Sequence, residues 1–291
     1  MMKFVPLFAA LAVGSVIDFP PDSTPRIPVE LFGDAEAFVT PVRVRGDELG
    51  TSLLHKFKSI TVNKRRILVG YGVNRTTFLA NPNEEPVTKE WSPDFDRVQE
   101  CLSNGLTQEL CQNHITLVEE TKSNNLLVCG TNAGSPMCRF YDVRYGNGRL
   151  EVAEVEGSIE DGSTIISPSA EWTMDSIYDA RSKHMYVAKE MGNHRGQIER
   201  FSFSSKSKDF LQLAENAFSA YGPVKIVKLL EHEEHVFLFF RERLRNGTDL
   251  SRVATICKND LGGSQNILSN KFTSFVKTTL NCPVSPEFSF R

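Results

Sequence analysis

The chain has 291 residues, a formal net charge of −3, 24% charged residues and 40% hydrophobic residues. The near-neutral balance excludes a nucleic-acid binder, because such proteins need a surplus of lysine and arginine to displace counterions from phosphates. The composition is ordinary for a globular protein, and the length allows one large domain or two small ones with a sizeable core.

The first 17 residues form a predicted secretory signal peptide. Lys3 gives a short basic start, residues 4–17 are apolar, and small residues precede the break at Asp18. A buried N-terminal strand or helix is the alternative, but the run is too short for a bilayer, which takes about 20 apolar residues. We therefore expect a secreted, extracellular chain, which is membrane-anchored only if a longer form continues beyond it.

Residues 18–49 are rich in proline and are predicted to be an extended lead-in before a domain that covers residues 50–291. Short strands separated by turns then follow, as expected for an all-β domain. The first three are predicted at residues 57–62, 67–71 and 76–80. Residues 91–110 are polar and irregular and are expected to be a loop.

Residues 111–138 carry the most distinctive pattern. Branched apolar runs at 114–118 and 125–129 flank a polar turn, which predicts an antiparallel hairpin. The second run leads into a loop that cysteines close at both ends, Cys129 and Cys138. A further hairpin is predicted around Gly146-Asn147-Gly148.

Later strands are predicted from the same alternation, at residues 176–178, 184–188, 197–203, 224–230 and 236–240. The last of these is apolar on both faces, as in a strand whose sheet is covered on both sides. One short amphipathic helix is predicted at residues 270–280, from apolar residues at i, i+3, i+4 and i+8. Many short strands favour a sandwich, barrel or propeller, and the pattern alone does not choose among them.

Six cysteines in a secreted chain indicate disulfides rather than metal sites. The local pairs are Cys101 with Cys111 and Cys129 with Cys138. Each would close a loop of roughly ten residues, worth about 2.7 kcal/mol in the chain-entropy model. The sequons at Asn74 and Asn246 are predicted glycosylation sites.

No pattern of catalysis stands out. In residues 231–235 the two histidines are spaced i and i+3, whereas the HExxH zinc motif needs i and i+4 on a helix, so a solvated loop is expected. Cys111 and His114 make half a zinc knuckle without a second half. We expect no catalytic residue, metal, cofactor or small-molecule substrate, and a protein that acts by binding; a secreted hydrolase on a propeller is the remaining alternative.

The cysteine-rich stretch resembles the semaphorin (sema) domain. Residues 111–115 and 127–138 are similar to the family's C-x-N-Y-I run and its V-C-G-T-N-A-F-x-P-x-C run. Residues 237–242 resemble its F-F-F-R-E strand, and residues 256–282 resemble C-K-N-D-x-G-G followed by K-W-T-T-F-L-K-A-R-L-x-C. The blocks occur in the family's order.

The resemblance also has departures. The family has Tyr at the position of His114, Phe at Gly134 and Trp at Phe272. A C-P-x-D-P block expected near residues 166–169 has lost its Cys and Asp. These departures bear on the partner more than on the fold.

The resemblance implies a seven-bladed β-propeller of four-stranded antiparallel blades, incomplete here, with about four blades in the N-terminal part of the domain. It also implies the disulfides Cys101–Cys111 and Cys129–Cys138. In the family, the equivalents of Cys257 and Cys282 form disulfides with cysteines further downstream. In this chain the alternatives are that Cys257 and Cys282 are free, that they bond to each other, or that the gene model is truncated.

The resemblance further implies a secreted ligand that binds a plexin-type receptor in cell or axon guidance, as a homodimer when full length. The alternative is a truncated or decoy fragment without signalling activity. The family places receptor contacts on loops of the middle blades, which map here to a loop between two strands. Its predicted contact residues are Lys189, Glu190, Met191, Asn193, His194 and Arg195.

Overall fold

The computed structural model describes residues 54–81, 83–122, 125–156, 160–192, 195–203, 210–214, 217–218, 222–264 and 268–280. All described residues belong to one compact unit, residues 53–291. The predicted signal peptide, the lead-in at residues 18–49 and Cys282 lie outside the described residues and stay predictions.

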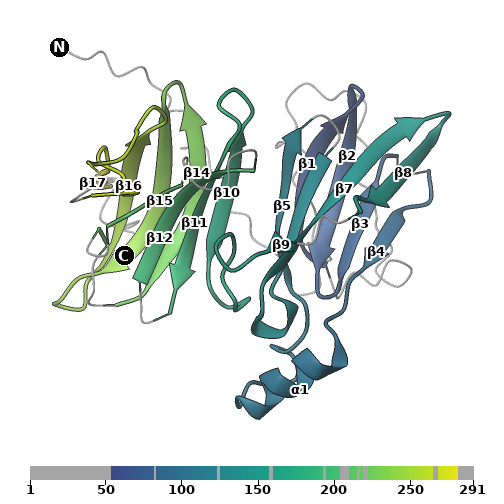
Figure 1. Ribbon diagram of the computed structural model, residues 1–291, viewed down its shortest axis with the longest axis horizontal. Helices are drawn as coiled ribbons and strands as arrows, with labels where there is room; N and C mark the ends of the chain where they lie inside the picture. The colour runs from purple at the N-terminus through teal and green to yellow at the C-terminus, as the bar shows by residue number, and fades with distance from the viewer. Residues whose placement is uncertain are drawn as a thin grey trace, which may run out of the picture. The chain divides into compact units, whose positions relative to one another are not determined.

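The described residues fold into four antiparallel sheets in chain order (Figure 1). Sheet 1 contains β1 (Leu54–Val62), β2 (Arg65–Gly72), β3 (Arg75–Leu79) and β4 (Val87–Glu90). Sheet 2 contains β5 (Ile115–Lys122), β6 (Asn125–Gly130), β7 (Met137–Gly146) and β8 (Arg149–Glu154), and the short β9 (Glu160–Asp161) pairs with β7.

Sheet 3 contains β10 (Met174–Asp179), β11 (His184–Met191), β12 (Arg195–Ser202) and β13 (Leu211–Gln212). Sheet 4 contains β14 (Val224–His232), β15 (His235–Arg243), β16 (Asp249–Cys257) and β17 (Val276–Thr279). Within each sheet the four strands pair in the order in which they occur in the chain, so every sheet is a simple meander.

Successive sheets pack face to face, because their central strands are apolar on both sides. In β6, Leu126 and Val128 belong to the core shared with sheet 1, whereas Leu127 belongs to the core shared with sheet 3. In β11, Val187 faces sheet 2 and Tyr186 faces sheet 4. Period-two alternation thus places sheets 2 and 3 each between two apolar layers, whereas sheets 1 and 4 each contribute to one of these cores.

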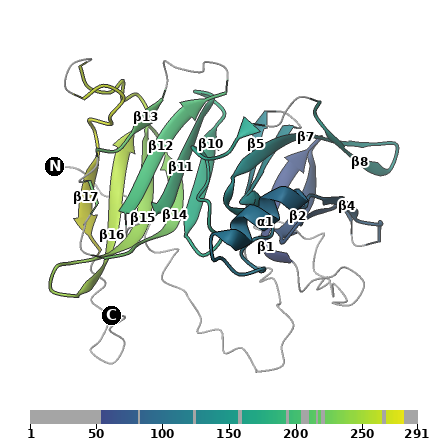
Figure 2. The ribbon, with the colours of Figure 1, turned by 60° about the horizontal axis from the view of Figure 1, so that its bottom comes forward.

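The first strands of neighbouring sheets lie side by side, β5 beside β10 and β10 beside β14 (Figures 1 and 2). Polar contacts join them. Lys58 on β1 pairs with Glu119 on β5 at 2.7 Å, and Ser176 on β10 donates a hydrogen bond to the same carboxylate at 2.9 Å. Lys228 on β14 pairs with Asp175 on β10 at 2.9 Å. Charges on the inner strands therefore link each sheet to the next.

The helix predicted at residues 270–280 is wrong. Phe272 and Phe275 pack into the core between sheets 3 and 4 from an irregular turn, and this turn produces the helix-like spacing. Residues 276–279 continue as β17, which pairs with β16. Three of these four residues are β-branched and favour a strand over a helix.

The expected loop at residues 91–110 contains a helix instead, α1 (Phe95–Ser103). Its apolar residues Val98, Cys101 and Leu102 follow i, i+3, i+4 and pack against Cys111 and the short turn η4 (Asn132–Gly134). The helix belongs to none of the four sheets and lies in the connection between β4 of sheet 1 and β5 of sheet 2 (Figure 1).

Candidate receptor-binding surface

The predicted receptor loop is the tip of the β11–β12 hairpin, and its first residue points inward. Lys189 is 1% exposed, and its Nζ donates to Glu199 Oε2 at 2.9 Å and to the backbone carbonyl of Thr164. Burial lowers the pKa of Lys189 against the opposing influence of Glu199, and burial likewise raises the pKa of Glu199. The prediction that Lys189 contacts the receptor is therefore corrected: this side chain is buried and has a structural role.

Glu190 is also buried, on the opposite face of β11. Its Oε2 accepts hydrogen bonds from the Thr173 backbone N–H and hydroxyl at 3.0 and 3.2 Å, and it pairs with Lys225 of β14 at 2.9 Å. The Ser167 hydroxyl donates to the Glu190 carbonyl at 2.6 Å. Glu190 thus fixes the hairpin against sheet 4. The prediction that Glu190 contacts the receptor is corrected in the same way, because this side chain is buried.

The described members of the predicted contact set at the rest of the tip are exposed. Met191 is 37% exposed and Arg195 is exposed, while Asn193 and His194 lie outside the described residues. A Cβ on Gly192 would lie 3.3 Å from the Trp172 ring, so this half-buried indole sits beside the hairpin turn. No sequence motif pointed to Trp172, although a single tryptophan in a polar loop is itself a signal for binding.

A second hydrogen-bond network lies within residues 111–138, the stretch that resembles the sema domain, and centres on the buried side-chain amide of Asn113. Its Nδ2 donates to the Trp91 carbonyl and its Oδ1 accepts from the Asn132 N–H, both at 2.9 Å. A Cβ added to Gly130 would lie 2.0 Å from Asn113 Oδ1. Position 130 therefore has to be glycine, because the amide occupies the space that any side chain would need.

Asn74 extends this network to sheet 1. Its Oδ1 accepts from the Asn113 N–H, and its Nδ2 donates to Gln112 Oε1, both at 2.8 Å. The backbone N–H of Asn74 also donates to the Asn113 carbonyl at 2.7 Å. A glycan on Asn74 would have to share the nitrogen that makes the Gln112 bond. Asn246, by contrast, is exposed in the β15–β16 turn.

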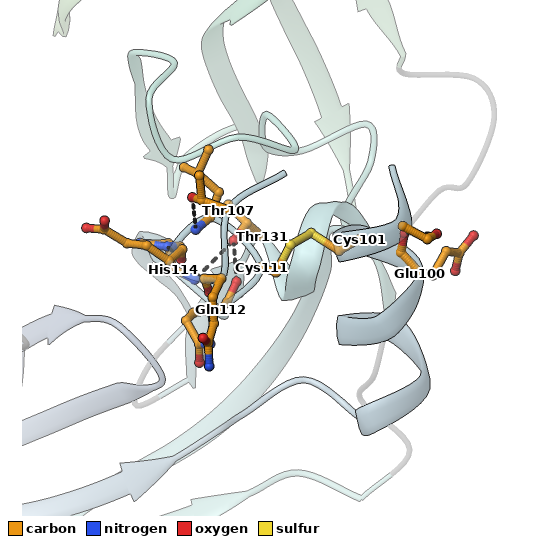
Figure 3. The surroundings of a disulfide bond; sticks show 11 residues. Glu100, Cys101, Thr107, Cys111, Gln112, His114 and Thr131 are labelled. Atoms are coloured by element: carbon orange, nitrogen blue, oxygen red, sulfur yellow. Dashed lines mark hydrogen bonds between the residues drawn. A yellow bond between two sulfur atoms is a disulfide. The ribbon is translucent and has the colours of Figure 1, made fainter. Parts of the chain in front are cut away.

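A disulfide anchors α1 to this network (Figure 3). The sulfurs of Cys101 and Cys111 are bonded, with their Cα atoms 5.7 Å apart. The Cys111 N–H donates to the Thr107 carbonyl at 3.0 Å, and the His114 N–H donates to the Thr131 hydroxyl at 3.0 Å. The bond therefore holds the helix against the loop that enters β5.

The second disulfide joins Cys129 on β6 to Cys138 on β7, which are register partners with Cα atoms 4.1 Å apart. Both are fully buried in the core between sheets 2 and 3. Cys257, at the end of β16, is half-buried and has no disulfide partner among the described residues. The predicted alternatives for Cys257 and Cys282 thus stay open.

The remaining candidate motifs have no site geometry in the described part of the chain. Residues 231–235 cover the end of β14, the two-residue turn and the start of β15, with His232 and His235 exposed. Across the residues that the structure describes, no three His, Cys, Asp or Glu side chains are placed to hold a metal ion. No described helix is long and apolar enough to span a membrane.

No protein-family model matches the chain. Its sequence is 27% identical to Semaphorin-6D of Mus musculus over 100% of this chain and 27% of that protein. It is 30% identical to Semaphorin-4B of Mus musculus over 89% of this chain and 32% of that protein. The chain thus spans about a third or less of these relatives.

Solved structures show the same fold. Drosophila Semaphorin 1a, extracellular domains 1-2, matches with a TM-score of 0.62 and 24% identity, over 79% of this chain and 43% of that one. Drosophila Plexin A in complex with Semaphorin 1b matches with a TM-score of 0.59 and 23% identity, over 81% of this chain and 44% of that one. The four meander sheets are therefore blades of a sema-type β-propeller. By its sequence relatives, the chain belongs to the semaphorin family.

Proposed function

We propose that this protein is an extracellular semaphorin-type guidance ligand that binds a plexin-type receptor. The observation that carries the proposal is the sequence similarity to semaphorins along nearly the whole chain, together with the match to the structure of Drosophila Plexin A in complex with Semaphorin 1b. The receptor contact is the β11–β12 tip, with Met191, Asn193, His194, Arg195 and the neighbouring Trp172.

Ion pairs at the base of the hairpin support this surface. Lys189 pairs with Glu199 in the core, and Glu190 pairs with the half-exposed Lys225, so the two residues of β11 before Met191 are anchored. Met191, Arg195 and the neighbouring Trp172 are of the side-chain types that are enriched at protein interfaces.

Surface plasmon resonance of the purified chain against plexin ectodomains from the same organism tests the proposal. Arg195→Glu should weaken binding by about tenfold, since reversing a charge at the contact adds repulsion. Arg245→Glu on the β15–β16 turn is the matched control and should bind like the unchanged protein. Absence of binding to every plexin ectodomain, or equal loss in both variants, would overturn the proposal.

The non-signalling alternative needs a second readout. Both faces of β15 are apolar, but Phe237 and Phe239 are only half-buried, so one face of sheet 4 is incompletely covered in the described structure. A decoy would bind plexin and compete with a longer semaphorin without causing a cellular response. A growth-cone collapse assay, with the oligomeric state measured by light scattering, separates a signalling homodimer from a competing monomer.

A further inference from the structure

The two N-x-T sequons lie in hairpin turns with different surroundings. Asn74 is in the β2–β3 turn of sheet 1, and Asn246 is in the β15–β16 turn of sheet 4. An N-glycan is carried by the side-chain nitrogen, Nδ2, and its transfer also needs the hydroxyl of the threonine two positions later. The surroundings of this nitrogen and of this hydroxyl therefore decide which sequon suits a glycan.

The β15–β16 turn presents its sequon to solvent. Asn246, Gly247 and Thr248 are all exposed. Asn246 Oδ1 accepts a hydrogen bond from the Thr248 N–H at 3.1 Å, which makes an Asx turn. The Leu244 N–H donates to the Thr248 carbonyl at 2.8 Å and closes the hairpin. The carboxamide is thus held through its oxygen, and the shape of the turn does not depend on Nδ2.

The β2–β3 turn uses its sequon to hold the fold together. Asn74 Nδ2 donates to Gln112 Oε1, and Asn74 Oδ1 accepts from the Asn113 N–H, both at 2.8 Å. Both ends of this carboxamide therefore bond to the segment that enters β5. Thr76, the other half of the sequon, is only 3% exposed in β3. A sugar on Nδ2 would take one of its two hydrogens and place a ring beside Gln112, so the glycan and the network compete for the same atom.

We propose that the folded, secreted protein carries an N-glycan on Asn246 and that Asn74 stays unmodified as a structural amide. The inference rests on the proposed extracellular function, since the transfer takes place in the secretory pathway. The donor is a lipid-linked oligosaccharide. A bond forms between Nδ2 and C1 of the first sugar, the bond from C1 to the lipid pyrophosphate breaks, and Nδ2 gives up one proton to the transferase. A chain modified at Asn74 loses the network around Asn113 and is retained as misfolded, whereas the β15–β16 turn accepts the glycan without losing a bond.

The test uses the full chain, with its own N-terminus, secreted from mammalian cells. Its mass before and after treatment with peptide N-glycosidase counts the glycans, and peptide mapping finds each asparagine that the treatment has converted to aspartate. We expect a glycan on Asn246 and none on Asn74. Thr248→Ala keeps Asn246 but ends its sequon, and should remove the glycan completely. Thr76→Val is the matched control at the other sequon and should leave the glycan mass unchanged.

Unfolding temperatures test the structural role of Asn74. Asn74→Ala should lower the unfolding temperature by about 5 °C, because the Asn113 N–H loses its acceptor. Thr76→Val and the exposed Asn246→Ala should each lower it by less than about 2 °C. Equal values for Asn74→Ala and Asn246→Ala would overturn the structural role of Asn74.

The outcomes separate this inference from the proposed function. A glycan on Asn74 in the secreted chain, or no glycan on Asn246, would overturn the inference and leave plexin binding as a proposal of its own. A chain that never enters the secretory pathway would overturn the inference together with the proposed extracellular function.

Discussion

Two junctions between neighbouring sheets are built from different chemistry. At the loop end, sheets 1 and 2 are joined by neutral amides, with Asn113 at the centre and Asn74 beside it. Sheets 3 and 4 are joined by charged groups, through Glu190 with Lys225 and through the Arg200 guanidinium on the Asp260 carbonyl. Charged groups also take part in the first junction, through the Lys58–Glu119 pair on the inner strands and the Tyr145 hydroxyl on Glu84, but the buried centre of the loop end is neutral.

The difference predicts how each junction fails. A neutral amide network depends on shape, because each donor and acceptor has one partner at a fixed distance and there is no room for added atoms. A charged junction depends on both members of each ion pair being present, because a buried charge that loses its partner keeps its full desolvation cost. The stability of the junction between sheets 1 and 2 should therefore be sensitive to added side-chain volume, and that of the junction between sheets 3 and 4 to charge removal and pH.

Gly130→Ala tests the neutral junction and has the largest expected effect. The new methyl group would displace the Asn113 amide and leave the Asn132 N–H and the Trp91 carbonyl without partners. We expect a loss of about 4 kcal/mol in the free energy of unfolding, from overpacking together with buried unsatisfied groups. Urea denaturation followed by tryptophan emission measures it.

Gly146→Ala is the matched control, because a Cβ at that position meets nothing within 4 Å. Its free energy of unfolding should change by less than about 0.5 kcal/mol. A small effect at Gly130 would mean that Asn113 can move away cheaply, and the contrast between a shape-limited and a charge-limited junction would fail.

Lys189→Met removes one member of the buried Lys189–Glu199 ion pair within sheet 3 and tests how much stability depends on an intact pair. It leaves Glu199 buried without its partner, and we expect a loss of about 3 kcal/mol in urea denaturation. The double variant Lys189→Met/Glu199→Leu should recover most of that loss, since neither charge then remains. Arg181→Ser, which removes an exposed pair with Glu234, should cost less than about 0.5 kcal/mol. A double variant as unstable as the single one would contradict the charge argument.

Much of the fold could be predicted from residue periodicity. Alternation located nearly every central strand, and the two short cysteine loops pointed to the pairs that the structure contains. Helix α1 was missed because it is short and polar, and only three apolar residues mark its buried face. The helix expected at 270–280 was wrong because two aromatic residues in a turn imitated helical spacing.

The candidate site was less predictable, because burial of a charged residue depends on a distant partner. Lys189 shares the inward face of β11 with Met185 and Val187, so strict alternation could have placed it inside. Glu190 likewise shares the other face of β11 with the buried Tyr186 and Ala188, but its partner Lys225 lies 35 residues away in another sheet, which alternation does not reveal. The role of Asn113 and the need for glycine at 130 likewise depend on contacts that only the folded chain creates.

Asp260 should make sheet 4 sensitive to acid. Burial alone would raise the pKa of this carboxyl, but hydrogen bonds from Ser274, Gly262 and Thr273 outweigh it and lower the pKa to about 2 from 3.8. A lowered folded-state pKa stabilises the protein above the unfolded value, and that stabilisation is lost as pH falls from about 4 to about 2.

The expected loss is about 2 kcal/mol over that interval, measured as the pH dependence of the free energy of unfolding. Asp260→Asn should be less stable near neutral pH and should show a flatter acid limb. Gly146→Ala removes no titratable group and no hydrogen bond to Asp260, so this control should keep the full loss of stability at acid pH. An unchanged acid limb in Asp260→Asn would mean that another carboxylate carries the effect.

Lys225→Met gives the smallest effect and the sharpest test of the charged junction. Lys225 is 45% exposed on its side chain, and Glu190 keeps two hydrogen bonds from Thr173, so the carboxylate stays partly satisfied. We expect a loss of about 1 kcal/mol, well below that for Lys189.

The fluorescence difference between the protein and its Trp172→Phe variant reports on Trp172 beside the hairpin. If Lys225→Met shifts this Trp172 signal and weakens plexin binding while stability barely changes, then the charged junction serves mainly to orient the β11–β12 tip. If neither changes, Thr173 alone holds Glu190, and the ion pair between sheets 3 and 4 contributes little to the position of the tip.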